Sequence, residues 1–155
     1  MIPFFRVALC FCALSGLALL SGREAGSRVQ YIGGTVSSLS AKSGGMLDIG
    51  DGDELLFAAR GTVVRVPYHD VNLIEYGQRV NRRYVEAVLI SPLLLLSKKR
   101  AHFVTVGYSD HAGRQQAMVF QVSGGDVRSV LVGLEARTGR KVEYQDDEAR
   151  KSGKG

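Results

Sequence analysis

Between residues 29 and 122 the sequence is a succession of short runs rich in Val, Ile, Leu, Tyr, Phe and Thr, separated by turns that contain glycine. Such runs, bounded by Gly, Asp and Ser, are typical of β-strands. The clearest pair, 102–108 and 115–122, flanks the polar loop 109–113 and predicts a hairpin. The other predicted strands are 29–39, with a bulge or bend at Gly33-Gly34, then 46–49, 54–59, 62–66 and 71–76.

One amphipathic helix is predicted after these strands, over residues 124–138. Ser123 is a suitable N-cap, and Gly139 provides a C-terminal stop. Beyond the helix, residues 142–144 predict a short strand, and residues 145–155 predict a charged, flexible tail. Four apolar residues have the i, i+3, i+4, i+7 spacing of a helix face that packs on a core: Val127, Val130, Leu131 and Leu134.

These elements predict a mainly β (α+β) fold of about seven antiparallel strands in a strongly bent sheet or partly open barrel. The C-terminal amphipathic helix is expected to cover its open end. Hydrophobic residues make up 45% of the chain and charged residues 23%, which argues against intrinsic disorder. No internal repeat or linker divides residues 28–144, so we expect them to form a single domain.

The N-terminal residues 1–22 have the order of a secretory signal. Arg6 precedes the uncharged, almost wholly apolar stretch 7–20, and small residues follow it. As a helix this stretch would cover about 21 Å, less than the roughly 30 Å core of a bilayer. We therefore expect an exported protein, periplasmic or secreted. The alternative is an uncleaved membrane anchor, because the predicted cleavage site lacks the preferred alanines. Cys10 and Cys12 both lie in this segment, so the folded domain is expected to have no disulfides.

Three consecutive segments have the pattern of an apolar strand, a Pro-aromatic corner and a second apolar strand. They are Leu55–Phe57, Val63–Tyr68 and Val71–Gly77. Together with the order of elements over residues 28–138, this pattern resembles the pleckstrin-homology-like (PH-like) superfold, especially its GRAM-type members. The resemblance implies binding of lipid head groups or peptides without catalysis. Small exported proteins of this kind also resemble bacterial envelope proteins.

Two sequence-adjacent pairs of histidine and carboxylate are candidates for catalysis: His69-Asp70 and Asp110-His111. A hydrolase would need a nucleophile that the histidine activates, but the sequence has no serine in a G-x-S-x-G elbow. We therefore predict that these are corner and turn residues and that the protein is not an enzyme. The alternative function is a small envelope hydrolase that uses one of these pairs.

Metal sites are also not predicted. The local acidic cluster fails the ligand spacing of a calcium-binding EF-hand loop, which favours a solvated hairpin turn. The three histidines, at positions 69, 102 and 111, have no metal-ligand spacing, and no cofactor is expected. The acidic cluster consists of Asp48, Asp51, Asp53 and Glu54.

Two basic clusters flank the apolar stretch 85–96. Core packing is one interpretation of that stretch, and solvated surface is the corresponding interpretation of the clusters. The functional interpretation is an apolar tip ringed by cations, suited to an anionic lipid surface or a protein partner in the envelope. Nucleic acid is not an expected partner, because no motif for its recognition is present. The predicted contact residues are Arg79, Arg82, Arg83, Lys98, Lys99 and Arg100.

Overall fold

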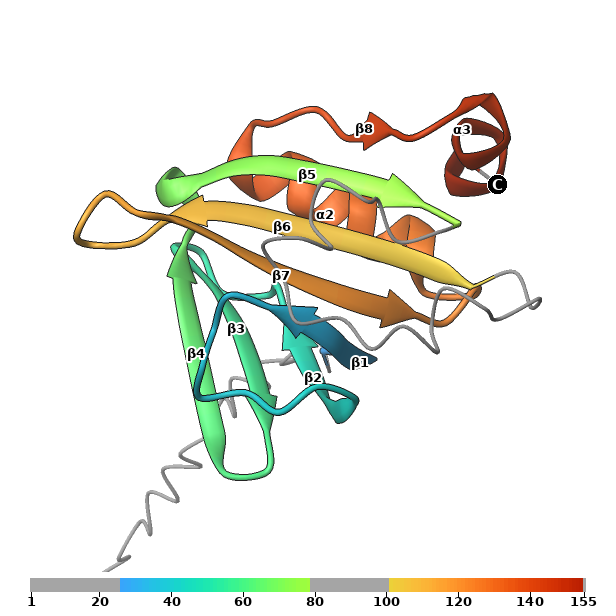
Figure 1. The fold of residues 1–155 in the computed structure, drawn as a ribbon. Coiled ribbons are helices and arrows are strands. Elements are labelled where there is room, and N and C mark those ends of the chain that lie inside the picture. The colour runs from blue at the N-terminus through green and yellow to red at the C-terminus, as the bar shows by residue number, and fades with distance from the viewer. Residues whose placement is uncertain (1–25, 79–100, 155) are drawn as a thin grey trace, which may run out of the picture.

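The computed structural model describes residues 26–78 and 101–154. The described chain forms one eight-stranded, open sheet and two C-terminal helices, so the predicted mainly β (α+β) class is confirmed (Figure 1). A short 3-10 helix, η1, spans Tyr68–Asp70. The strands are β1 (Ser27–Gly34), β2 (Ser43–Asp48), β3 (Glu54–Ala59), β4 (Thr62–Pro67), β5 (Val71–Gly77), β6 (His102–Ser109), β7 (Gln115–Val122) and β8 (Glu143–Tyr144).

The strand order in the sheet is β4-β3-β2-β1-β7-β6-β5-β8. The first seven strands pair antiparallel with their neighbours, as predicted. The eighth differs, because β8 pairs parallel to β5 through Glu75 and Tyr76. Figure 1 shows β2, β3 and β4 crossing steeply relative to β5, β6 and β7, with β1 at the bend.

The bend coincides with the predicted irregularity in β1. The pairing of β1 with β7 shifts register between Tyr31 and Gly33. At Gly34 a side chain would collide with the neighbouring strand, because a Cβ there would lie 2.2 Å from the carbonyl oxygen of Ala117. Glycine therefore permits the close approach to β7. The strand ends at Gly34, five residues before the predicted end at Leu39, and the Thr35 amide still donates to the Ala117 carbonyl at 3.0 Å.

The core lies on the concave side of the bend and is centred on three aromatic rings. Phe57 and Phe120 have ring centroids 4.9 Å apart, and Tyr31 lies 6.1 Å from each of them. These rings come from β3, β7 and β1, and all three side chains are buried. They join the two differently oriented parts of the sheet.

Helix α2 (Val127–Thr138) packs its predicted apolar stripe on the sheet. Its start differs from the prediction, because the backbone N–H groups of Asp126 and Val127 donate to the Ser123 carbonyl and the helix has no side-chain cap. Its end is as predicted, with Gly139 in the left-handed conformation at φ 69°. The buried stripe consists of Val127, Val130, Leu131 and Leu134.

The C-terminal residues differ from the prediction of a flexible tail, because Asp147–Lys154 form helix α3. The Asp146 carboxylate accepts a hydrogen bond of 2.6 Å from the Ala149 amide, and Asp147 and Glu148 occupy the first turn. Acidic groups stabilise a helix N-terminus, so local charges favour this helix without an apolar stripe. In the part of the chain that the structure describes, no helix has the length and hydrophobicity needed to cross a membrane.

Candidate functional site

All six predicted contact residues lie in 79–100, outside the described residues. The structure describes the two points where this basic segment joins the sheet. The chain leaves β5 after Gly77 and returns at Ala101, and Gly77 pairs with Phe103 of β6. The ends of the segment are therefore attached to adjacent strands at one end of the sheet.

A tyrosine–histidine hydrogen bond links these two strands beside the attachment points. The Tyr76 hydroxyl lies 2.6 Å from Nδ1 of His102, and the two rings are nearly parallel at a centroid distance of 6.1 Å. Burial raises the pKa of Tyr76 above its ordinary value. The hydroxyl is therefore protonated at neutral pH. It donates a hydrogen bond to Nδ1 in the histidine tautomer that has no proton on this nitrogen.

A second polar contact ties the β5 side of the segment to the C-terminal helix. The side-chain amide of Gln78 donates to the Ser152 hydroxyl of α3 at 2.7 Å. That hydroxyl in turn donates to the Glu148 carbonyl at 2.7 Å. Gln78 is the last described residue before the segment. Its contact with Ser152 therefore connects the start of the segment to a helix that is distant in sequence.

The predicted histidine–carboxylate pairs lie at two surface positions, one on η1 and one in the β6–β7 loop. His69 Nε2 is 3.4 Å from Asp70, but the His69 side chain is 82% exposed on η1. His111 is exposed in the β6–β7 loop. Neither pair has a serine or threonine hydroxyl among its hydrogen-bond partners within the described ranges, so no nucleophile is positioned by them there.

The acidic cluster forms a hairpin turn between β2 and β3. The Asp51 carboxylate accepts hydrogen bonds from the amides of Asp53 and Glu54 at 2.8 and 3.0 Å, and these lower its pKa. The Asp48 carboxylate accepts from the Gly50 amide at 2.9 Å. Among the described residues, no group of three or more His, Cys, Asp or Glu side chains is placed to hold a metal ion.

A cavity that the sequence analysis did not predict lies beside the end of β1. Its volume is about 480 Å³, within the range of small-molecule sites, and none of the described residues that line it is charged. The bend at Gly33-Gly34 indicated an irregular strand, but nothing in the sequence indicated a cavity. Its lining residues are Tyr31, Gly33, Gly34, Thr35, Val36, Ser37, Leu39 and Ala41.

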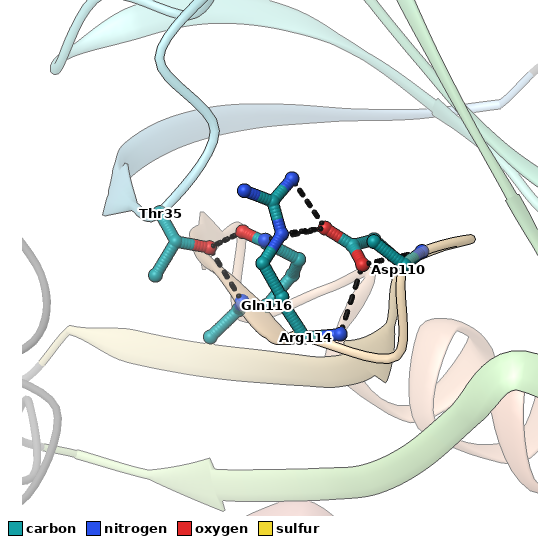
Figure 2. Close-up of polar contacts among 6 residues, drawn as sticks. Thr35, Asp110, Arg114 and Gln116 are labelled. Carbon is teal, nitrogen blue, oxygen red and sulfur yellow. Dashed lines mark hydrogen bonds and ion pairs between the residues drawn. The ribbon is translucent and has the colours of Figure 1, made fainter.

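Polar side chains fix one wall of this cavity to the β6–β7 hairpin, as Figure 2 shows. The Thr35 hydroxyl donates to the Gln116 side chain and accepts from the Ala117 amide at 3.0 Å. Gln116 then donates to the Asp110 carboxylate at 3.0 Å. Arg114 donates to the same carboxylate from its backbone amide and its guanidinium, each at 2.9 Å.

These donors also determine the charge of Asp110. The hydrogen bond from the Arg114 amide is the largest cause that lowers the pKa of Asp110, to about 2. The carboxylate is therefore ionised at neutral pH and is fully engaged in holding the hairpin loop. It orders the hairpin loop and, through Gln116, the Thr35 side chain that lines the cavity.

No protein-family model matches this chain, and a search of curated proteins finds no relative.

Proposed function

We propose that this protein is a non-catalytic binding module of the cell envelope that contacts an anionic lipid surface through residues 79–100. Its architecture is proposed to be PH-like, of the GRAM type. Support for this comes from the run of seven antiparallel strands followed by α2, which is compatible with that superfold. The envelope location rests on the signal-like residues 1–22.

The observation that carries the proposal is the distribution of charge along the chain. Residues 79–100 contain six Lys or Arg and one Glu, a net charge of +5, whereas the remaining residues contain fourteen basic and fourteen acidic side chains. The whole net charge of the protein therefore comes from one connection between β5 and β6. A charge that served only solubility would have no reason to be concentrated in this way.

The composition of that connection also suits a membrane surface. Its basic clusters flank the mainly apolar stretch 85–96, which is too short to span a bilayer. Apolar side chains that enter the interface, with cations around them, are a common means of binding anionic membranes. The Tyr76–His102 and Gln78–Ser152 contacts provide a fixed base for the connection.

The test is sedimentation of the protein with vesicles of phosphatidylcholine alone or mixed with phosphatidylglycerol. We expect binding only to the anionic vesicles, and we expect it to weaken as salt screens the surface charges. Each cation near an anionic membrane contributes about 1 kcal/mol, so the triple variant Lys98→Gln, Lys99→Gln and Arg100→Gln should bind at least about tenfold more weakly.

A matched control removes three exposed cations from the described residues: Arg28→Gln, Arg128→Gln and Arg140→Gln. Because its net charge changes equally, it separates local contact from overall attraction. Equal binding of both triple variants, or equal binding to neutral vesicles, would overturn the proposal. Absence of vesicle binding combined with a defined protein partner captured from envelope fractions would favour the protein-binding alternative instead.

A further inference from the structure

The outer edge of β5 is covered by the chain's own C-terminus, residues 140–154, which we call the strap. Within the strap, β8 pairs with only two residues of β5, and the Gln145 amide donates to the Tyr76 carbonyl at 3.1 Å. An uncovered strand edge offers unpaired N–H and C=O groups to another extended chain. The strap therefore occupies a place where an added strand would bind (Figure 1).

Side chains of the strap make specific contacts at this edge, which would favour one amino-acid sequence in an added strand. Val142 is 8% exposed, and the ring of Tyr144 meets that of Tyr76 edge-on at 6.0 Å. The Gln145 side chain donates to Glu75 at 2.8 Å. It lies where a side chain on Gly77 would be, since a Cβ there would be 1.8 Å from its amide oxygen. The edge thus accommodates a Tyr-Gln pair, which follows Val142, whose amide donates to the Glu135 carboxylate of α2 at 2.9 Å.

The rest of the strap is held by small and polar contacts. Ala149 is fully buried, but it is the only apolar side chain of α3. At Gly153 a Cβ would lie 2.8 Å from the ring of Tyr144. The backbone of α3 therefore packs directly against this ring without an apolar side chain between them. Elements with little buried apolar surface open at a lower free energy than the core they cover.

We propose that the β5 edge is a strand-addition site and that the strap is exchangeable, so that the strap of a second copy of this chain can bind there. Exchange would re-form the same contacts between identical residues, which makes it inexpensive. The strap follows α2 at Gly139, and its first two residues, Arg140 and Lys141, form a short exposed link. The strap contains five basic and four acidic residues, so two copies would not repel each other strongly. Exchange would also re-form the Gln78–Ser152 contact, and it does not require vesicle binding by residues 79–100.

The first test uses a fluorescent peptide of residues 140–155 added to the full chain. The tethered strap competes at a high effective concentration, so wild type should bind the peptide weakly. In the variant Ala149→Glu the larger side chain displaces α3 and frees the edge. The peptide should then bind about tenfold more tightly or better, because the competent state is more populated. Tyr144→Ala provides a second, independent way to weaken the strap.

The matched control is Glu143→Ala, an exposed position of the same strand, which should bind the peptide as weakly as wild type. A peptide with Val142→Ala and Tyr144→Ala should not bind any variant. The proposal is overturned if the folded strap variants fail to bind the peptide. It is also overturned if both strap variants lose the β-sheet signal in circular dichroism, because the strap would then be an integral part of the fold.

The second test shortens the link by deleting Arg140 and Lys141 from the full chain. Each residue removed shortens the reach by up to about 3.6 Å, so the strap can no longer close on its own β5. We expect light scattering after gel filtration to give a dimer whose sheet signal matches wild type. A folded monomer at all concentrations would contradict exchange between copies.

Discussion

The two C-terminal helices are attached to the same sheet by different means. Helix α2 inserts a stripe of four apolar side chains, each no more than 3% exposed. Helix α3 contributes one fully buried apolar residue, Ala149, and is otherwise held by hydrogen bonds such as that between Gln78 and Ser152. Apolar burial contributes more to stability than hydrogen bonds that replace bonds to water. We therefore expect α2 and α3 to differ in stability although both pack on the same sheet.

The largest expected effect comes from removing part of the α2 stripe. Leu134 is 0% exposed, and Leu134→Ala would leave a cavity beneath the helix. We expect it to reduce the free energy of unfolding by about 2–5 kcal/mol, measured by urea denaturation. The exposed Val132, on the opposite face at 57% exposure, is the matched control, and Val132→Ala should have little effect. A similar loss of stability in both variants would contradict the conclusion that the buried stripe attaches α2 to the sheet.

A smaller and more local effect is expected in the strap. Gln145→Ala removes the 2.8 Å hydrogen bond to Glu75, and a typical intramolecular hydrogen bond contributes about 0.5–1.5 kcal/mol. We expect the free energy required to open the strap to fall by this amount. Faster proteolysis at the exposed basic residues of the strap would measure it. The urea midpoint of the whole domain should stay close to that of wild type. A fall in that midpoint as large as that of Leu134→Ala would show that strap and sheet unfold together.

The smallest effect is expected at acid pH, at the end of the sheet opposite the strap. The pKa of Asp110 is lowered from 3.8 to about 2, so its ionised form stabilises the folded state above pH 4. That contribution is lost as pH falls from about 4 toward 2, because the carboxylate then becomes protonated in the folded state also. Asp110→Asn should show a flatter decline of thermal stability over this interval. An unchanged slope would contradict the role given to the Asp110 hydrogen bonds.

The elements that could be predicted from the sequence are those with a periodic apolar pattern. The β6–β7 hairpin and the α2 stripe could both be predicted. Side chains on one buried face are two residues apart in a strand and three to four apart in a helix. Helix α3 has no such pattern. Its signal is the acidic run Asp146-Asp147-Glu148 at a helix start, which resembles the composition of a solvated tail.

The sites were less predictable, because they depend on contacts between distant residues. His102 and Tyr76 are hydrogen-bonded across two strands, and neither position has a local motif. The cavity beside β1 arises from a bulge and from close approach of Gly34 to β7, which only the sheet register determines. The basic contact residues remain a prediction from the sequence, since they lie outside the described residues.

Native-state hydrogen exchange tests the expected difference in stability between α2 and α3 most directly. The amides of Gln145 and Arg150 report on the strap, because Gln145 donates to the Tyr76 carbonyl of β5 and Arg150 donates to the Asp146 carbonyl within the strap. Those of Leu131 and Leu134 report on α2. The strap amides should exchange at least about 100-fold faster, with rates that low concentrations of urea barely change. Exchange of all four amides with one free energy and one urea dependence would contradict the account.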